Sequence, residues 1–407
     1  MKKIILSTGL LFLFGILFGN DFPGQQPGTE IGGNLPNGYE PSGAVWHHGL
    51  QKLFLVNDNG MVTKMDADGS NVINWYVAGD LEGICIADST SDFVYLGVEQ
   101  PDYISEFNVV TGVVTRSFDL TPWMTGPSNL GLEALTFVPD STNAEGGFFY
   151  AGLQYDGNIY VFELPIKTSS TSTTVTYVNT FTPVSGRWDI SGLHFEASNE
   201  TLYAIWDSSN KLRAMEVDCT NIMEWDLPGN DQEGITLWSG DSLAQNLLFI
   251  AEDVGKEVWK YDFNSELIIT IINDGSVIFE PDPPGYYGSF VTLTAIPDDG
   301  NYFSEWSDDL TGSSNPETLL MDYDKNVTAT FSYLNSPENV IINIVSDSVF
   351  IQWDAVPGAT GYNVYSSTEP YSDPENWTLE IEETIETSWE NPVSSENMFY
   401  YVSTINN

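Results

Sequence analysis

The stretch DLEGICIAD, residues 80–88, contains the pattern that decides the fold, because four other stretches repeat it. In each copy an acidic or small polar residue is followed by Gly or Ala and then by an apolar run. The other copies are PSGAVWHH at 41–48, GLEALTF at 131–137, DISGLHF at 189–195 and DQEGITLW at 231–238. We call the central polar residues the anchors: Ser42, Glu82, Glu133, Ser191 and Glu233. Their intervals of 40, 51, 58 and 42 residues indicate a repeat architecture.

Short apolar runs fill the segment around the anchors. Between residues 38 and 266 these runs alternate apolar and polar positions and are separated by Gly, Asp, Asn and Ser. The second unit contains four of them, GICIA, FVYLGVE, YISEFNV and VVTRSFDL. Four short strands in each repeated unit predict an all-β fold of the propeller type, in which every four-stranded sheet is one blade around a channel.

The number of blades stays open at five or six. Five units can be counted, but the last one, which ends near residue 266, lacks a clear fourth strand. We expect the stretch from Glu30 to Leu35 to supply that outer strand, which would remove an exposed sheet edge and close the ring. The long third unit, from Glu133 to Gly186, includes a Ser/Thr tract and leaves room for a sixth, degenerate blade.

The repeat has a chemical consequence at the anchors. Residues at equal positions of the inner strands form one ring around a propeller channel, so Glu82, Glu133 and Glu233 are expected to face each other. Clustered carboxylates repel unless they are protonated or bind a cation, and Ca²⁺ prefers oxygen ligands of this kind. These three residues are the predicted metal ligands, with Ser42 and Ser191 as weaker neighbours. Alternatively, the Glu side chains accept N–H bonds at strand ends without an ion, and the residues alone leave both interpretations open.

A second set of polar residues follows each anchor by 16 to 21 positions, where the next strand ends. These residues would line one mouth of the channel as further ligands or as support for the ligands: Asp58, Glu99, Gln154, Asp207 and Glu252. Turn chemistry alone explains polar residues at strand ends, and we prefer that interpretation. The stretch MDADGSN at 65–71 lacks the full spacing of a calcium loop and predicts a tight turn.

The repeat segment resembles a known group of propellers. The series DLEGI, GLEAL, DISGL and DQEGI, each at the start of a predicted inner strand, is similar to the SdiA-regulated (YjiK-like) propellers, relatives of the phytase-like and esterase-like propellers. The resemblance implies a propeller whose channel-facing Glu residues hold a calcium ion. It says more about the fold than about a biochemical role.

Two further β domains are predicted after the repeats. Residues 267–333 resemble the divergent bacterial surface repeat of the internalin B-repeat type, on the matching stretches GSV, VTLTAIPDDG, FSEW and DKNVTATF. Residues 334–407 resemble a fibronectin type III domain, an Ig-like sandwich, with Trp353 and Tyr362 at core positions. Both are expected to act as spacers or adhesion modules.

Charge and targeting signals restrict the partners. The chain has 58 acidic and 12 basic residues, a net charge of −46 that repels nucleic acid and anionic membranes. Residues 1–20 combine two Lys residues with an apolar run and predict a signal peptide, so residues 21–266 form the predicted propeller. The protein is expected to be exported, to the cell surface, the periplasm or the exterior. Cys85 and Cys219 are predicted to be buried free thiols.

These features predict an exported, calcium-binding propeller that acts as a ligand-binding or adhesion module. We expect a monomer with an extracellular partner, a glycan or a surface protein, and no membrane insertion after signal cleavage. The alternative is a calcium-dependent esterase or phosphodiesterase of the phytase-like kind that uses the central channel. The sequence has no GxSxG motif, so no catalytic residue is assigned and enzymatic activity is not established. Only nine basic residues lie between Asp21 and Glu266, unclustered in sequence, which counts against phosphate-ester hydrolysis.

Overall fold

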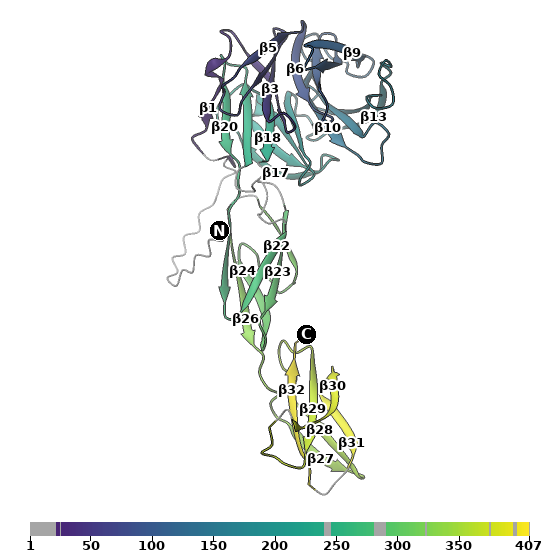
Figure 1. Ribbon diagram of the computed structural model, residues 1–407, viewed down its shortest axis with the longest axis vertical. Coiled ribbons are helices and arrows are strands. Elements are labelled where there is room, and N and C mark those ends of the chain that lie inside the picture. The colour runs from purple at the N-terminus through teal and green to yellow at the C-terminus, as the bar shows by residue number, and fades with distance from the viewer. Residues whose placement is uncertain are drawn as a thin grey trace.

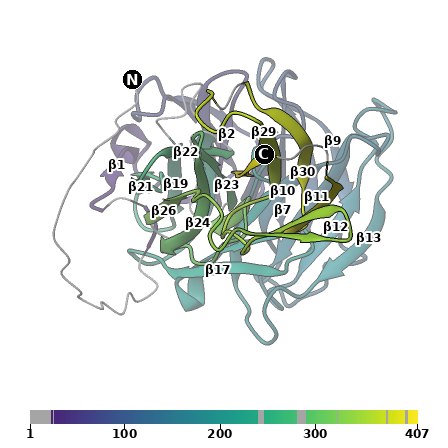
Figure 2. The same ribbon diagram turned by 90° about the horizontal axis from the view of Figure 1, so that it is seen from below.

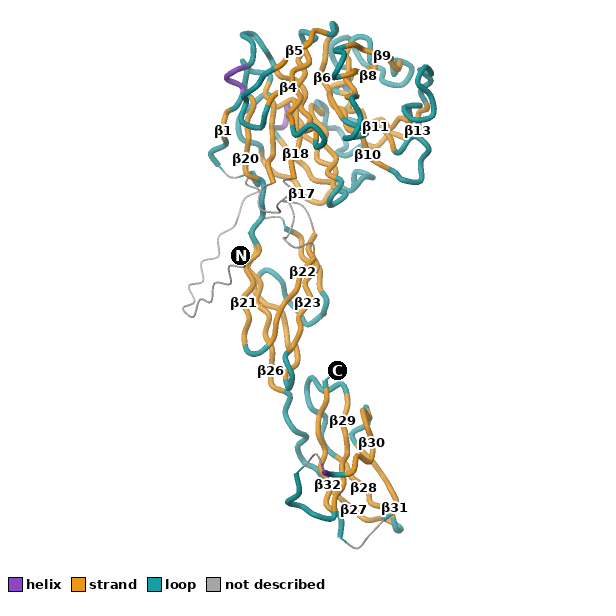
Figure 3. The backbone as a smooth tube through the Cα atoms, in the orientation of Figure 1, coloured by secondary structure: helices purple, strands orange, loops and turns teal. Residues whose placement is uncertain are grey.

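A computed structural model describes residues 22–24, 26–239, 246–280, 290–321, 324–373, 376–393 and 397–406. The signal peptide predicted at residues 1–20 lies outside these ranges. The described chain is built from β-strands, with two short 3₁₀ helices, η1 (Gly32–Asn34) and η2 (Asp207–Ser209). Figure 3 shows how strands dominate. Within these ranges no helix is long and apolar enough to cross a membrane.

The repeat segment forms five sheets, each of four antiparallel strands. The first and second sheets consist of β2 (Pro41–His47), β3 (Lys52–Asn57), β4 (Met61–Met65) and β5 (Ile73–Tyr76), then β6 (Asp80–Cys85), β7 (Phe93–Glu99), β8 (Tyr103–Asn108) and β9 (Val113–Asp119). The third and fourth consist of β10 (Leu132–Pro139), β11 (Gly147–Leu153), β12 (Ile159–Glu163) and β13 (Thr176–Phe181), then β14 (Ile190–Glu196), β15 (Thr201–Trp206), β16 (Lys211–Met215) and β17 (Asn221–Asp226). The fifth consists of β18 (Gln232–Ser239), β19 (Asn246–Glu252), β20 (Val258–Asp262) and β1 (Thr29–Glu30).

The fifth sheet takes its outer strand from the beginning of the chain. β1 pairs antiparallel with β20, with Thr29 opposite Lys260 and Glu30 opposite Trp259. The prediction that the N-terminal part of the chain completes the last unit is confirmed, but the expected stretch from Glu30 to Leu35 is wrong in its bounds: the strand is Thr29–Glu30, and Gly32–Asn34 form η1. The strand ends early because the Glu30 carboxylate accepts the N–H of Gly32, which turns the chain into η1.

The first strands of the five sheets form a closed circle of contacts. β2 contacts β6, β6 contacts β10, β10 contacts β14, β14 contacts β18, and β18 returns to β2. Three of these junctions carry a hydrogen bond: from Trp46 N to Thr236 Oγ1 (2.9 Å), from Phe195 N to Thr136 Oγ1 (3.0 Å) and from Ser191 Oγ to the carbonyl oxygen of Gln232 (2.7 Å). The third unit, which is described throughout, forms a single four-stranded sheet, so its extra length adds a loop and not a sixth sheet.

The apolar core is divided among the junctions between neighbouring sheets. Five clusters of buried side chains each combine residues of two adjacent sheets, and the cluster of the fifth and first sheets contains Leu53 and Phe249. Cys85 and Cys219 are free and buried in two different clusters, as predicted. Because every sheet buries its two faces against two neighbours, removing one sheet would expose apolar surface on two others.

Twelve further strands follow the repeat segment (Figures 1 and 2). Two three-stranded sheets contain β21 (Leu267–Ile272), β22 (Gly275–Glu280), β23 (Phe290–Pro297), β24 (Asn301–Asp308), β25 (Glu317–Leu320) and β26 (Lys325–Tyr333). Two more contain β27 (Ile341–Val345), β28 (Ser348–Gln352), β29 (Gly361–Ser367), β30 (Thr378–Thr384), β31 (Ser388–Pro392) and β32 (Phe399–Ile405). No described sheet mixes strands of the three segments.

Aromatic residues fill both C-terminal cores, and Trp353 and Tyr362 are buried as predicted. Trp306 and Phe331 lie in the core of the first pair of sheets, where Phe303 packs against them. Trp353 and Tyr362 lie in the core of the second pair, with their rings 5.4 Å apart. The assignment of residues 334–407 to the fibronectin type III family, and the domain boundaries at 266/267 and 333/334, stay predictions.

Candidate metal site

Every anchor occupies a β-bulge near the beginning of the first strand of its sheet. In all five sheets the pairing register shifts between the residue before the anchor and the residue after it. In the second sheet, for example, Leu81 pairs with Val98 and Gly83 with Gly97, which leaves Glu82 without a partner on the ladder. A bulge redirects the side chain of the extra residue. The five anchors are therefore the unpaired bulge residues at the same position of their sheets.

The bulges surround one small cavity. Its lining comes from all five first strands: Gly43, Ala44, Glu82, Gly83, Ile84, Glu133, Ala134, Leu135, Ser191, Gly192, Leu193, Glu233, Gly234 and Ile235. The predicted convergence of the five stretches is thus confirmed. The cavity is small: the volume that the centre of a water molecule can occupy is about 10 Å³. It therefore has room for about one water molecule or one ion.

The two Ser anchors differ from each other. Ser191 lines the cavity, but its hydroxyl donates to the carbonyl oxygen of Gln232 at 2.7 Å. Ser42 is not among the lining residues, and its hydroxyl donates to the carbonyl oxygen of Glu40 at 3.4 Å. Both hydroxyls are engaged with backbone, so the carboxylates are the groups left to act in the cavity.

The small residues after the anchors let the first strands approach closely. A Cβ atom added to Gly234 would lie 2.7 Å from the backbone nitrogen of Ala44, in the neighbouring first strand. On Gly43 it would lie 2.7 Å from the carbonyl oxygen of Glu82. Real Cβ atoms do not make contacts this short with backbone atoms. The repeated Gly or Ala is therefore explained by crowding.

Gly234→Ala is expected to lower the free energy of unfolding by about 1–3 kcal/mol, because the new methyl group overpacks a rigid backbone junction. Urea denaturation measures this change. Gly33→Ala is the matched control, because the nearest atom to its new Cβ would be 3.9 Å away. Equal stability of the two variants would show that the junction between β18 and β2 is not tightly packed.

Burial and mutual repulsion shift the acid groups of the cavity strongly. Burial raises the pKa of Glu82 most, and a hydrogen bond with Asp80 and the negative charge of Asp80 raise it further, to about 10. The charges of Glu233 and Glu99 add smaller effects. Burial, followed by the charges of Glu82 and Glu233, raises the pKa of Glu133 well above its ordinary value. The pKa of Glu233 is raised in the same direction, first by burial and then by Asp207 and other nearby carboxylates. Without a cation the raised pKa values favour the protonated form of these carboxyl groups.

Other carboxylates accept the backbone N–H groups at the strand starts. Glu99 Oε1 accepts the N–H of Gly131 at 2.6 Å, Asp102 Oδ1 accepts that of Leu132 at 2.9 Å, and Asp207 Oδ1 accepts that of Gln232 at 3.1 Å. Among the described residues, no backbone N–H donates to the carboxylates of the three anchor Glu residues. The interpretation of the anchors as strand caps therefore lacks the hydrogen bonds that it requires.

The second set of polar residues lies at the ends of the second strands, as predicted, and serves mainly local structure. Glu99 and Asp207 cap the first strand of the following sheet. The backbone N–H of Gln154 donates to the carbonyl oxygen of Gly131 at 2.8 Å, and Asp58 is exposed. Burial and the neighbouring Glu257 raise the pKa of Glu252 to about 7. The MDADGSN stretch forms the predicted turn, closed by Asp66 N and the carbonyl oxygen of Ser70.

One residue of the acidic cluster was missed by the sequence reasoning. Asp80, Glu82 and Glu99 each place a carboxylate oxygen within 4.8 Å of the other two, close enough to share one ion. Asp80 is paired with Glu99 across the sheet, at the entrance of the strand that carries Glu82. The only signal in the sequence was the D-x-E pattern of the quoted stretch itself. Glu133 and Glu233 are not in this group, although they line the same cavity as Glu82. The candidate ligands are therefore Asp80, Glu82 and Glu99, with Glu133 and Glu233 on the other sides of the cavity.

Five basic side chains of the repeat segment that could approach a channel mouth are engaged elsewhere. Arg187 and Arg213 both pair with Glu224, and Lys211 pairs with Asp226. The remaining two bind backbone or an aromatic ring: Lys256 donates to the carbonyl oxygens of Gly33 and Leu35, and Lys64 lies over the ring of Trp75. None of these five side chains is therefore free to bind an anion at the acidic cluster.

Comparison with known proteins identifies one part of the chain. The family model of the divergent InlB B-repeat domain matches residues 266–335, which confirms the resemblance predicted for residues 267–333. No curated protein was found to match the chain. Among solved structures, the glutaminyl cyclase of Myxococcus xanthus is similar with a TM-score of 0.40 and 13% sequence identity, over 55% of this chain and 90% of that chain. A similarity at this level carries no argument about activity.

Proposed function

We propose that the five sheets are the blades of a five-bladed propeller that binds one calcium ion at its centre and acts as an exported ligand-binding or adhesion module. A single observation carries the ion: Glu82, Glu133 and Glu233, from three different sheets, line one cavity of ion size, and no backbone N–H of the described residues donates to their carboxylates. Like charges this close must be protonated or must share a cation.

The donor set suits calcium better than other common ions. Ca²⁺ takes six to eight oxygen ligands in flexible geometry, whereas Mg²⁺ demands a near-ideal octahedron and Zn²⁺ favours nitrogen and sulfur ligands. The cluster offers carboxylate oxygens only, from Glu82, Glu133 and Glu233 with Asp80 and Glu99 nearby. A bound ion would supply positive charge that links the second, third and fifth sheets. We therefore propose a structural role for it.

The rest of the chain supports a role outside the cytoplasm. The InlB-type repeat is typical of surface or exported bacterial proteins, and the N-terminal sequence has the pattern of a signal peptide. We propose that residues 334–407 form a fibronectin type III domain and that both C-terminal segments hold the propeller away from its attachment. The net charge of −46 favours neutral or cationic partners.

The geometry does not favour the esterase or phosphodiesterase alternative. The central cavity has room for about one water-sized species, which is less than an ester substrate needs. The basic residues that could grip a phosphate form ion pairs or backbone contacts elsewhere. We therefore place ligand binding on another part of the propeller.

Metal analysis of the purified protein tests the calcium site. After dialysis against calcium-free buffer, mass spectrometry of the digested protein is expected to find about one calcium per chain. Glu133→Gln is expected to weaken calcium binding at least tenfold in calorimetric titration, because it removes one buried charged ligand. Glu216→Gln is the matched control, since Glu216 is exposed at the end of β16. A wild-type protein that neither retains nor binds calcium would refute the site.

The calcium-free protein is expected to become less stable as the pH rises. The pKa of Glu82 is about 10 in the folded protein against an ordinary value of 4.5, so the folded state binds more protons than the unfolded state between these values. The stability that this group contributes is complete below pH 4.5 and is lost as the pH rises through 10, by about 1.4 kcal/mol per pH unit for each extra proton bound.

Urea denaturation at pH 5.5 and pH 8.5 measures this effect, once in EDTA and once in excess calcium. With calcium bound the carboxylates are ionised in the folded state, so the loss at pH 8.5 should disappear. Glu82→Gln in EDTA should show a smaller loss than the wild type. A calcium-free protein that is equally stable at both pH values would contradict the raised pKa values.

A further inference from the structure

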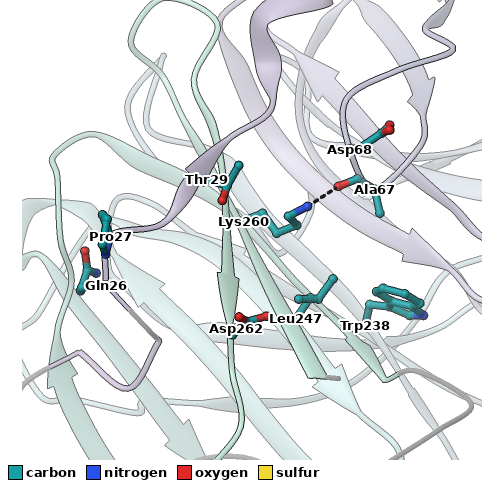
Figure 4. Close-up of a pocket in the computed structure, with 9 residues that line it drawn as sticks. All are labelled: Gln26, Pro27, Thr29, Ala67, Asp68, Trp238, Leu247, Lys260 and Asp262. Carbon is teal, nitrogen blue, oxygen red and sulfur yellow. Dashed lines mark hydrogen bonds between the residues drawn. The ribbon is translucent and has the colours of Figure 1, made fainter. Parts of the chain in front are cut away.

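We propose that a second, larger cavity, at the end of the fifth sheet remote from the carboxylate cluster, binds a neutral carbohydrate. It rests on the ligand-binding part of the proposed function and does not require the calcium ion. The cavity has a volume of about 540 Å³, and its lining residues are shown in Figure 4: Gln26, Pro27, Thr29, Ala67, Asp68, Trp238, Leu247, Lys260 and Asp262. The anchor Glu233 lies at the beginning of β18, whereas Trp238 lies near its end.

The sheet register explains why these side chains share one face. Trp238 is opposite Leu247 across β18 and β19, and Leu247 is opposite Asp262 across β19 and β20, so the three form a row. Lys260 lies two residues before Asp262 and therefore on the same face, with Thr29 of β1 opposite it. The N-terminal strand that closes the ring thus also completes this face.

The other wall comes from the first sheet. The turn between β4 and β5 carries Ala67 and Asp68, and Lys260 Nζ donates a hydrogen bond to the carbonyl oxygen of Ala67 at 3.2 Å (Figure 4). This bond joins the two walls at one end of the cavity. The cavity is therefore built by two sheets that are far apart in sequence, since the two residues of this bond are separated by 193 positions.

The aromatic wall is held in place before any ligand arrives. The ring of Trp238 lies 5.1 Å from that of Trp46, and Trp46 is stacked on Phe249 at 5.9 Å. Leu247, next to Trp238, is buried. A rigid aromatic side chain loses little conformational freedom on binding, which favours affinity.

The mixture of groups fits a sugar better than other small molecules. The volume lies within the usual range of about 300–1,000 Å³ for small-molecule sites. The apolar C–H face of a sugar ring can pack on the Trp238 indole, while its hydroxyls can donate to Asp68 and Asp262 and accept from Lys260. A purely apolar ligand would leave those polar groups unpaired, at a cost. An anionic ligand would meet two carboxylates and a chain of net charge −46.

Calorimetric titration with defined sugars tests this inference. The probes are cellotetraose, xylotetraose, laminaritetraose, maltotetraose and mannotetraose, with tetragalacturonate as the anionic comparison. At least one neutral tetrasaccharide is expected to bind, and the anionic one is not. Trp238→Ala and Asp262→Asn should each weaken binding at least tenfold. Asp262 is exposed, so its substitution leaves the core intact.

The controls separate this inference from the metal site. Trp377→Ala, in the C-terminal segment, should leave sugar binding unchanged, and Trp238→Ala should leave the calcium content unchanged. Binding that survives both cavity variants, or no binding of any neutral tetrasaccharide, would overturn the carbohydrate site. A protein that holds calcium but binds none of the sugars refutes this inference alone. A protein that binds a sugar through Trp238 but holds no calcium refutes the metal site alone.

Discussion

Chelation of calcium is expected to lower the melting temperature of the repeat segment by about 5–15 °C. A ligand present at 100 to 1,000 times its Kd stabilises the folded state by about 2.7–4.1 kcal/mol. For a domain of about 150–250 residues each kcal/mol shifts Tm by about 2–4 °C. A large effect is expected because, without an ion, burial and the charges of neighbouring carboxylates raise the pKa values of Glu82, Glu133 and Glu233 and so disfavour their ionised forms in the cavity.

Differential scanning calorimetry with calcium, then with EDTA, then with calcium restored measures this shift. Restoring calcium should recover the original Tm, whereas the same concentration of magnesium should recover little. Glu133→Gln should melt at nearly the same temperature with and without EDTA. An unchanged wild-type Tm in EDTA would exclude a structural calcium ion, whatever the acidic cluster does otherwise.

Replacing Arg116 is expected to lower the free energy of unfolding by about 3–5 kcal/mol, because it leaves a buried carboxylate without its partner. Arg116, in β9, pairs with Glu106, in β8, and both side chains are buried. The guanidinium also donates to the carbonyl oxygens of Pro165, Ser169 and Ser172 at 2.8–3.1 Å. Burial alone would raise the pKa of Glu106, but the hydrogen bonds and charge of Arg116 lower it.

Urea denaturation of Arg116→Met gives this free energy. The double variant Arg116→Met/Glu106→Gln should recover part of the loss, because the orphaned charge is gone. Lys211→Met is the matched control: its partner Asp226 is largely exposed, and such surface pairs contribute at most about 1 kcal/mol. If Arg116→Met cost no more than Lys211→Met, the pair would not be desolvated in solution.

The repeated pattern was sufficient to predict repeated four-stranded sheets, since strand length, polar turns and the Gly or Ala after each anchor are local properties. It did not decide between five and six of them, because the length of the third unit fits either a loop or a further sheet. The outer strand from the N-terminus was also predictable, because a sheet edge without a partner must be covered. The bulges were not predictable. Glu82 is a bulge residue because Leu81 pairs with Val98 and Gly83 pairs with Gly97. That register is set by the pairing of the whole sheet and not by the residues next to Glu82.

The roles of the individual carboxylates could also be predicted only in part from the sequence. Turn chemistry correctly indicated a structural role for most of the second set, but local rules do not show that Glu99 caps Gly131, 32 residues away in another sheet. Glu99 lies near both that backbone and the cluster of Asp80 and Glu82. Only the packing of neighbouring sheets distinguishes a carboxylate that accepts an N–H from one that faces the cavity.

The two-residue strand β1 has a mechanical consequence. The two C-terminal segments leave the repeat segment directly after β20, which ends at Asp262, and β20 is the strand that β1 covers. If the C-terminus is tethered, any tension on the protein enters at this strand. Beside it, the circle is held by the pairs of Thr29 with Lys260 and Glu30 with Trp259, and by the bond from Ile31 N to the carbonyl oxygen of Val258. In a protein tethered by its C-terminus, a pulling force would therefore enter next to the seam between β1 and β20.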